Sequence, residues 1–280
     1  MDILAGLPIN LNWWASWWGG LSIWFFGLWS LQCIQRNAVL ADLGFCLGLT
    51  AFIIGCALYI EGDVLHRLLI MSMATIYALR LGYHFFVYRI YRKAEDHRYQ
   101  TLRIKWEPHA QAYLFVYFQA QALAILALAF PLCLLMAKAS SGWTIWEGMG
   151  GLLWIVAILG EAIADAQLEQ FRSNPKNRGQ TLQQGLWHYS RHPNYFFEGL
   201  HWCAYVPMGI GLPYGWLTII NPLLMVGTLL KVSGIPLAEA QALKNRGEGY
   251  RQYQQTTNAL IPWPPRQQST PKIYCIKKEK

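Results

Sequence analysis

Long apolar stretches alternate with short polar ones along most of this chain. Each of seven such stretches has close to the ~20 residues that a helix needs to cross a bilayer. Because hydrocarbon offers no water to unpaired backbone groups, these stretches are expected to be helical. The pattern therefore predicts an all-α, polytopic membrane bundle with about seven transmembrane helices, at residues 11–33, 39–60, 64–87, 112–136, 143–163, 195–212 and 214–230.

The composition supports a membrane protein. Of the 280 residues 54% are hydrophobic and only 14% are charged, a balance that is unusual for a soluble domain. A chain of this length is expected to form a single bundle over residues 1–263, followed by a flexible basic tail at 264–280. Four tryptophans near the predicted first helix (Trp13, Trp14, Trp17 and Trp18) suggest an interfacial belt, which leaves the start of this helix open.

The positive charges predict the orientation. Most of the 23 Lys and Arg residues fall in the loops and the tail on one side of the predicted topology. The positive-inside rule then places the N-terminus outside and the C-terminus in the cytoplasm. Basic loops beside anionic lipid account for the net charge of +8, so no nucleic acid is implied. No basic segment precedes the first span, which predicts a bacterial inner membrane protein rather than a cleaved precursor; an endoplasmic reticulum location is the alternative.

The six cysteines are scattered, mostly within the predicted spans. No pair has the spacing of metal ligands, and none forms a recognisable disulfide framework. They are expected to serve as small apolar fillers, and no metal site is predicted.

The residues at 185–198 form the densest polar cluster, although they lie between two apolar stretches. Pro193 suits the first turn of a helix, because its missing N–H would be unpaired there anyway. The free N–H groups of a helix start favour phosphate, and Arg191 and His192 stand just before it. With Asn194 and Glu198 in the first turns, the cluster predicts a polar pocket for a charged ligand. The alternative is an interfacial turn.

Three carboxylates near the end of the predicted fifth span, Glu161, Asp165 and Glu169, recur every four residues and so share one helix face. Arg172 follows Glu169 at a spacing of three. Carboxylates accept hydrogen bonds from ribose hydroxyls well. A ladder of helix-end salt bridges is the alternative.

Three further clusters have a structural alternative beside the functional one. Arg80 with Tyr83 lies in the third span, where an arginine is costly and therefore a functional candidate; an ion pair with Asp42 is the structural alternative. The charged run at residues 95–99 is typical of a solvated face. The polar helix from Glu239 to Tyr250 forms either a surface helix or a lid over the pocket.

Five ordered motifs carry a family resemblance: LRLGYHFFVYR, AEDHRYQTLR, GEAIADAQLEQFR, GLWHYSRHPNYFFE and SGIPLAEAQALKNRGEGYRQYQQTTNALIPW. They span residues 79–263 and resemble the membrane steroid 5-alpha-reductase-like family, in particular its bacterial branch of unknown function (DUF1295). The N-terminal third resembles it less, although Asp42 looks like that family's polar position early in the bundle.

The resemblance implies a seven-helix bundle that binds NADPH from the cytoplasmic side and reduces a carbon–carbon double bond conjugated to a carbonyl. Hydride goes to the β carbon, while an acid from the N-terminal half protonates or polarises the carbonyl oxygen. Motif by motif, the resemblance implies that the cofactor is held by Arg98, Asp165, Arg172, Tyr189, Arg191, His192, Asn194, Tyr195 and Glu198, and more loosely by Arg80, Glu239 and Tyr250.

This activity is consistent with the composition, since an apolar bundle dissolves a lipid-like enone while its polar end takes the dinucleotide. The first choice for the acid is Tyr83, with Glu61 or Asp42 as its partner, because a buried carboxylic acid can stay protonated and donate. The family's own acid pair has no clear counterpart here, so a steroid substrate is not implied. The expected partners are a lipid-like substrate and membrane lipids, and the expected state is a monomer or weak oligomer.

Two other functions compete. Membrane methyltransferases of the isoprenylcysteine and phospholipid type look similar around Arg-His-Pro-x-Tyr and bind S-adenosylmethionine. The Asn194 side chain, the AEDHRY loop and Asp165 favour the reductase branch. The third hypothesis is a non-catalytic assembly factor or lipid-binding protein on the same scaffold, which the density of polar groups at one helix start disfavours.

Overall fold

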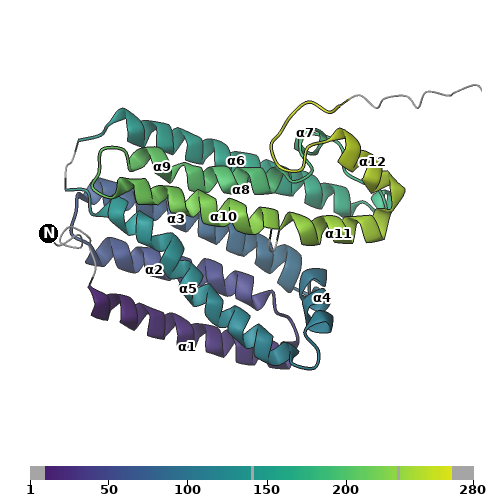
Figure 1. Ribbon diagram of the computed structural model, residues 1–280, viewed down its shortest axis with the longest axis horizontal. Helices are drawn as coiled ribbons and strands as arrows, with labels where there is room; N and C mark the ends of the chain where they lie inside the picture. Colours follow the sequence, from purple (N-terminus) through teal and green to yellow (C-terminus); the bar gives the residue numbers. More distant parts are fainter. Residues whose placement is uncertain (1–9, 140–141, 232–233, 267–280) are drawn as a thin grey trace, which may run out of the picture. The chain divides into compact units, whose positions relative to one another are not determined.

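The protein is described by a computed structural model that covers residues 10–139, 142–231 and 234–266, and no strand occurs within these ranges. The helices appear in Figure 1 with the same labels. In chain order they are α1 (Leu11–Gln35), α2 (Leu40–Tyr59), α3 (Val64–Phe85), η1 (Phe86–Ile90), α4 (His97–Lys105), α5 (Ala110–Met136), α6 (Ile145–Ser173), η2 (Pro175–Asn177), α7 (Leu186–Tyr189), α8 (Pro193–Cys203), α9 (Tyr205–Met208), η3 (Gly215–Ile219), α10 (Ile220–Lys231), α11 (Ile235–Arg246) and α12 (Glu248–Thr256).

Five stretches of the described chain are long and apolar enough to cross a membrane: Leu40–Tyr59, Val64–Ile90, Ala110–Met136, Ile145–Ser173 and Gly215–Arg246, the last of which includes the undescribed residues 232–233. They correspond to the predicted second, third, fourth, fifth and seventh spans. The all-α class is therefore confirmed, and the helices are compatible with an integral membrane protein. The count of seven is not reproduced.

The two remaining predictions differ from the structure for separate reasons. The first span is one helix, α1, of 25 residues, which is not among the five stretches; its first two turns carry Trp13, Trp14, Trp17 and Trp18, each with a polar indole N–H group. The sixth is divided between α8 and α9, each too short to cross alone. The division falls at Ala204, and Pro207 in α9 has no N–H to donate to the turn before it.

The described residues form two compact units. Unit 1 comprises those of Met1–Ile155 and Leu200–Gly227, and unit 2 comprises those of Val156–Gly199 and Thr228–Lys280. The single bundle predicted over residues 1–263 stays a prediction. The predicted flexible tail lies outside the described residues from residue 267 onward.

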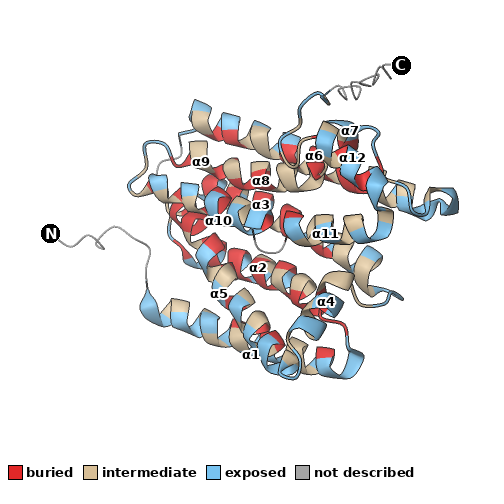
Figure 2. Ribbon diagram, turned by 45° about the vertical axis from the view of Figure 1, so that its right-hand side comes forward, coloured by how far each residue is buried: buried red, intermediate tan, exposed pale blue. Residues whose placement is uncertain are grey.

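In unit 1, α2 forms the centre and packs against α1, α3 and α5. Its Gly44 and Gly48 allow this close approach, because a Cβ at either position would meet side chains of α1 or α5 within 3.0 Å. Figure 2 shows buried residues along α2, whereas α1 is mostly exposed or intermediate. Cys56 of α2 and Cys133 of α5 lie buried side by side in this core, with their Sγ atoms 2.7 Å apart.

Unit 2 is organised around the end of α6 and the turn from α7 to α8. The indole of Trp187 donates to the Ala164 carbonyl at 3.0 Å, and the Gln167 side chain accepts from the Leu186 amide at 3.0 Å. Gly185 begins this turn with a φ of +59°, a conformation that other residues rarely adopt. These contacts fix residues 185–194 on the last turns of α6, where the predicted cofactor residues are concentrated.

Candidate functional site

Arg191 is at the centre of the polar cluster in unit 2. Its Nε donates to Glu239 Oε1 at 2.7 Å, and its Nη2 lies at 2.7 Å from the same oxygen. Its Nη1 donates to the carbonyls of Gln254 and Thr257. A guanidinium has five N–H donors, so Arg191 already spends most of them within the protein. It therefore ties the start of α8 to α11 and α12, rather than reaching out for phosphate as the sequence suggested.

Glu239 is the acceptor that holds this cluster together. Besides Arg191, it accepts from the Gln254 amide at 2.7 Å and lies 3.2 Å from His192 Nε2. The His192 ring is parallel to that of Tyr195, with 5.3 Å between their centroids. The structure thus brings together four predicted cofactor residues: Arg191, His192, Tyr195 and Glu239.

Sequence reasoning missed two residues that fix the backbone here. Ser190 is fully buried, and its hydroxyl donates to the Leu260 carbonyl at 2.7 Å. The Tyr253 hydroxyl donates to the carbonyls of Trp187 and Ser190. Tyr253 follows Tyr250 by three residues on α12, and both are buried. That spacing, which puts two tyrosines on one helix face, was the available signal.

Tyr250 faces the same cluster, because its hydroxyl is hydrogen-bonded to Arg191. Burial, together with the charge of the nearby Glu239 carboxylate, raises the pKa of Tyr250 to about 12. Its hydroxyl therefore stays protonated at neutral pH and can donate a hydrogen bond.

A second contact links α6 to α8. Asn194 Nδ2 donates to Asp165 Oδ1 at 3.2 Å, and Asp165 is buried. Glu161, Asp165 and Glu169 all lie on the single helix α6, as their spacing predicted. Glu161 is buried as well, while Glu169 pairs with the half-exposed Arg172 at 3.1 Å. Part of the row is thus a salt bridge, and part is a buried carboxylate–amide contact.

Arg172 and Arg246 are the groups in unit 2 best suited to hold an anion. The Arg246 guanidinium lies 5.9 Å from the centre of the Tyr250 ring, and the Arg172 side chain is half-exposed. Guanidinium groups bind phosphate through charge-assisted hydrogen bonds. Tyr189 is exposed, whereas Asn194, Tyr195 and Glu198 are half-buried on the first turns of α8.

In unit 1, Asp42 is joined to Arg98 and Tyr99. Arg98 Nη2 donates to Asp42 at 3.1 Å, and the Tyr99 hydroxyl donates to the same carboxylate at 2.6 Å. Tyr99 is only 2% exposed, and burial beside the Asp42 charge raises its pKa well above the ordinary value. The Asp42 carboxylate is thus already engaged by a guanidinium and a phenol, so it is poorly placed to donate a proton to a substrate.

The charged run at residues 95–99 does not form a solvated face. Asp96 caps α4 by accepting from the Arg98 amide at 2.9 Å, and it pairs with Arg89. Glu95 accepts from Arg103 at 2.9 Å and from the amide of Ala38 at 2.8 Å. The sequence pattern did not show that partners from distant segments would meet this loop.

The Asp96 ion pairs predict a loss of stability in acid. Burial raises the pKa of Asp96, but the positive charges of Arg98 and Arg89 outweigh it and hold the pKa at about 2. Because an unfolded Asp has a pKa of ~3.9, these interactions contribute about 2 kcal/mol above pH ~4, and this is lost as the pH falls toward ~2. Unfolding of wild type and Asp96→Asn should therefore differ most at pH 6 and converge near pH 2. A constant difference would contradict the assignment.

The proposed acid and its partners are only partly brought together. Tyr83 lies in the last turn of α3 and is 67% exposed, on the same end of unit 1 as Asp42, because Gly82 packs against Leu43 and Cys46. Glu61 precedes the first turn of α3, and this 22-residue helix is about 33 Å long. The structure therefore does not bring Tyr83 and Glu61 together. Arg80, one turn before Tyr83, is half-buried.

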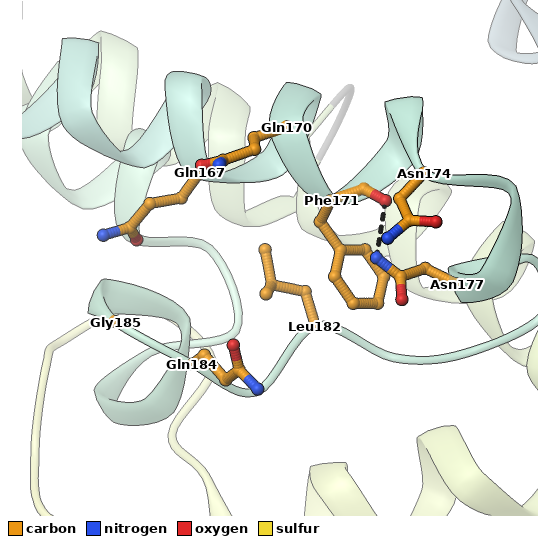
Figure 3. Close-up of a pocket in the computed structure, with 8 residues that line it drawn as sticks. All are labelled: Gln167, Gln170, Phe171, Asn174, Asn177, Leu182, Gln184 and Gly185. Atoms are coloured by element: carbon orange, nitrogen blue, oxygen red, sulfur yellow. Dashed lines mark hydrogen bonds between the residues drawn. The ribbon is translucent and has the colours of Figure 1, made fainter.

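Unit 2 also contains a pocket that the sequence did not predict. It has a volume of about 380 Å³ and lies between the end of α6 and the segment leading into α7 (Figure 3). Five carboxamides dominate its lining, beside one aromatic and one aliphatic side chain. The lining residues are Gln167, Gln170, Phe171, Asn174, Asn177, Leu182, Gln184 and Gly185.

Five described stretches that are long and apolar enough to cross a membrane are compatible with an integral membrane protein. Residues 28–257 of the chain match the family model described as a protein of unknown function (DUF1295), so the chain belongs to that family. The match begins well before residue 79, where the predicted motifs begin. No curated protein and no solved structure matches the chain.

Proposed function

We propose that this protein is an integral-membrane oxidoreductase that transfers hydride from NADPH to the conjugated double bond of a lipid-like enone. Family membership alone does not carry this activity, because the family is described as one of unknown function. The support comes from the site in unit 2 and from the resemblance of its motifs to steroid 5-alpha-reductases.

One observation carries the proposal: three segments of unit 2 that are distant in sequence are in contact in the structure. Asp165 of α6 contacts Asn194, Arg191 and His192 contact Glu239, and Tyr250 contacts Arg191. Residues that the resemblance assigns to one cofactor are thus joined by hydrogen bonds across about 85 residues of sequence. A rigid shell of this kind is what a site needs to hold a large polar ligand in one orientation.

The residues present fit a dinucleotide phosphate. Arg172 and Arg246 offer two guanidinium groups to phosphate: Arg172 pairs with Glu169 but is half-exposed, whereas Arg191 is buried against Glu239. The Asp165–Asn194 pair offers a carboxylate and an amide to ribose hydroxyls. The protonated Tyr250 hydroxyl adds a further donor. In this proposal Arg191, His192 and Glu239 position the shell, while Tyr189, Tyr195 and Glu198 line its approach.

Bound NADPH would supply the hydride. The protein would supply the proton or hydrogen bond at the carbonyl oxygen of the enone, where negative charge develops. Tyr83 remains our choice for this donor, because its side chain is 67% exposed at the end of α3, where a substrate could reach it. Asp42 would act through Arg98 and Tyr99 rather than as the acid, and Glu61 is too distant to assist Tyr83.

We also propose seven crossings, with the N-terminus outside and the cofactor site facing the cytoplasm of a bacterial inner membrane. The 25-residue α1 is long enough to cross, and α8 with α9 would supply the remaining crossing. The basic loops support this orientation. Single cysteines placed at Lys138 and Lys105 of a cysteine-free protein should react with an impermeant maleimide in cells at residue 138 only. Labelling at residue 105 alone would reverse the orientation.

Cofactor binding tests the proposed function. The detergent-solubilised protein should be stabilised against heat by NADPH, more weakly by NADH, and not by S-adenosylmethionine. The weaker effect of NADH follows from the missing 2′-phosphate, which removes about two negative charges that the arginine pair could bind. Stabilisation by S-adenosylmethionine alone would instead make the same residues a methyl-donor site, and stabilisation by neither would favour a non-catalytic role.

A further inference from the structure

None of the residues proposed above for the cofactor or for the acid lines the amide-lined pocket. Its five carboxamides carry no net charge, yet each offers both donors and an acceptor. A site for an anion would need positive groups, and a site for a lipid tail would need apolar ones. Amides therefore select a neutral ligand whose edge alternates donors and acceptors, as the edge of a nucleobase does.

The apolar part of the lining suits the faces of such a ring. In Figure 3, Phe171 and Leu182 lie between the amides of Asn177 and Gln184. Leu182 is buried and Phe171 is half-buried, so a planar ring placed against them would lose water from its face. The pocket volume of about 380 Å³ is within the range of small-molecule sites and exceeds the size of one base.

Three of the amides hold the pocket walls, which leaves Gln170 and Gln184 for a ligand. Asn174 Oδ1 accepts from the Lys176 amide at 3.0 Å. Asn177 Nδ2 donates to the Phe171 carbonyl at 2.9 Å, and Gln167 Oε1 accepts from the Leu186 amide at 3.0 Å. Gln170 and Gln184 are exposed at the pocket. They are therefore the residues best placed to read the edge of a base without disturbing the fold.

The pocket shares its framework with the proposed cofactor site. Gln167 is two residues from Asp165 on α6, and Arg172 directly follows Phe171. We infer that this pocket binds the adenine base of an adenine nucleotide, with its phosphates toward Arg172. This deepens the proposed function and rests on it for the identity of the whole cofactor, but the base itself can be tested alone.

The probes are adenosine 2′,5′-bisphosphate and inosine 2′,5′-bisphosphate, which carry the same charge and differ only at the purine edge. The full-length protein in detergent should bind the adenosine compound roughly ten-fold more tightly, since amide contacts distinguish bases by this order. The double variant Gln170→Leu with Gln184→Leu should lose that preference. Gln183→Leu is the matched control, because Gln183 is exposed beside the pocket but does not line it.

A second measurement locates the base directly. Photolysis with 8-azidoadenosine 2′,5′-bisphosphate should label a peptide within residues 167–185, and NADPH should prevent the labelling. An unchanged base preference in the double variant, or labelling elsewhere, would overturn the pocket assignment while leaving stabilisation by NADPH intact. Binding of neither bisphosphate would overturn it as well. Binding of both probes without any stabilisation by NADPH would instead overturn the proposed function.

Discussion

Replacing Glu239 with alanine is expected to destabilise unit 2 severely. The carboxylate accepts from Arg191 and Gln254 and contacts His192, and the Arg191 side chain is only 10% exposed. Without Glu239, this guanidinium stays buried with no charge to balance it, which costs about 3–5 kcal/mol when a buried pair is broken. Denaturant unfolding in detergent should show this loss, and NADPH should no longer stabilise the protein at concentrations that suffice for wild type.

The matched control is Glu248→Ala. Glu248 also pairs with an arginine, Arg251, but both side chains are about two-thirds exposed and the distance is 3.5 Å. Solvent screening makes such a pair worth ~0–1 kcal/mol. Equal losses for the two variants would mean that burial of the Arg191–Glu239 pair does not stabilise unit 2.

Replacing Tyr83 with phenylalanine should lower turnover by roughly 10²- to 10⁴-fold, the usual contribution of a positioned acid. The hydroxyl is 67% exposed and the ring is retained, so the fold should not change. NADPH binding should also be unchanged, because Tyr83 is not among the proposed cofactor residues and its ring is retained. The measurement is NADPH oxidation with an enone that wild type reduces.

Tyr88→Phe provides the control for this experiment. Tyr88 is five residues further along, in η1, and is likewise exposed. Its loss should leave turnover within two-fold of wild type, a bound that we set on the ordinary effect of a surface change. If Tyr83→Phe retains full turnover, the proton donor is another residue.

The apolar pattern predicted the second, third and fourth candidate spans closely, because helix length in a membrane is limited by bilayer thickness. The fifth and seventh begin as predicted but run on to Ser173 and Arg246. The pattern failed at α8 and α9, where Ala204 and Pro207 interrupt an apolar stretch that is long enough overall. The pattern also could not distinguish α1 from the candidate spans, because each tryptophan has a large apolar ring and a polar N–H group. Length and hydropathy describe an apolar stretch as a whole, whereas the point at which its helix ends depends on local backbone hydrogen bonds.

The site was predictable where spacing along one helix determines it. Glu161, Asp165 and Glu169 share α6 as expected, and Pro193 begins α8. Contacts between distant segments were not predictable, since the sequence does not show that Glu239 meets Arg191 or that Tyr99 meets Asp42. For the same reason, Arg191 was expected to hold phosphate when its donors are used within the protein.

The pocket was missed for a different reason. Its lining amides are neutral, so they do not stand out among the charged residues of the same segment. Gln167, Gln170 and Asn174 recur at spacings of three and four along α6 and just beyond it, so a search for polar side chains on one face would have found them.

Hydride transfer tests the central proposal most directly. The purified protein would be incubated with (4R)- or (4S)-[4-²H]NADPH and a bacterial lipid extract, and the lipids would be analysed by mass spectrometry. One of the two cofactors should place a single deuterium on a lipid whose double bond has been reduced, and Tyr83→Phe should slow this. If neither cofactor labels any lipid, while methyl-deuterated S-adenosylmethionine does, the protein is a methyltransferase and the account is wrong.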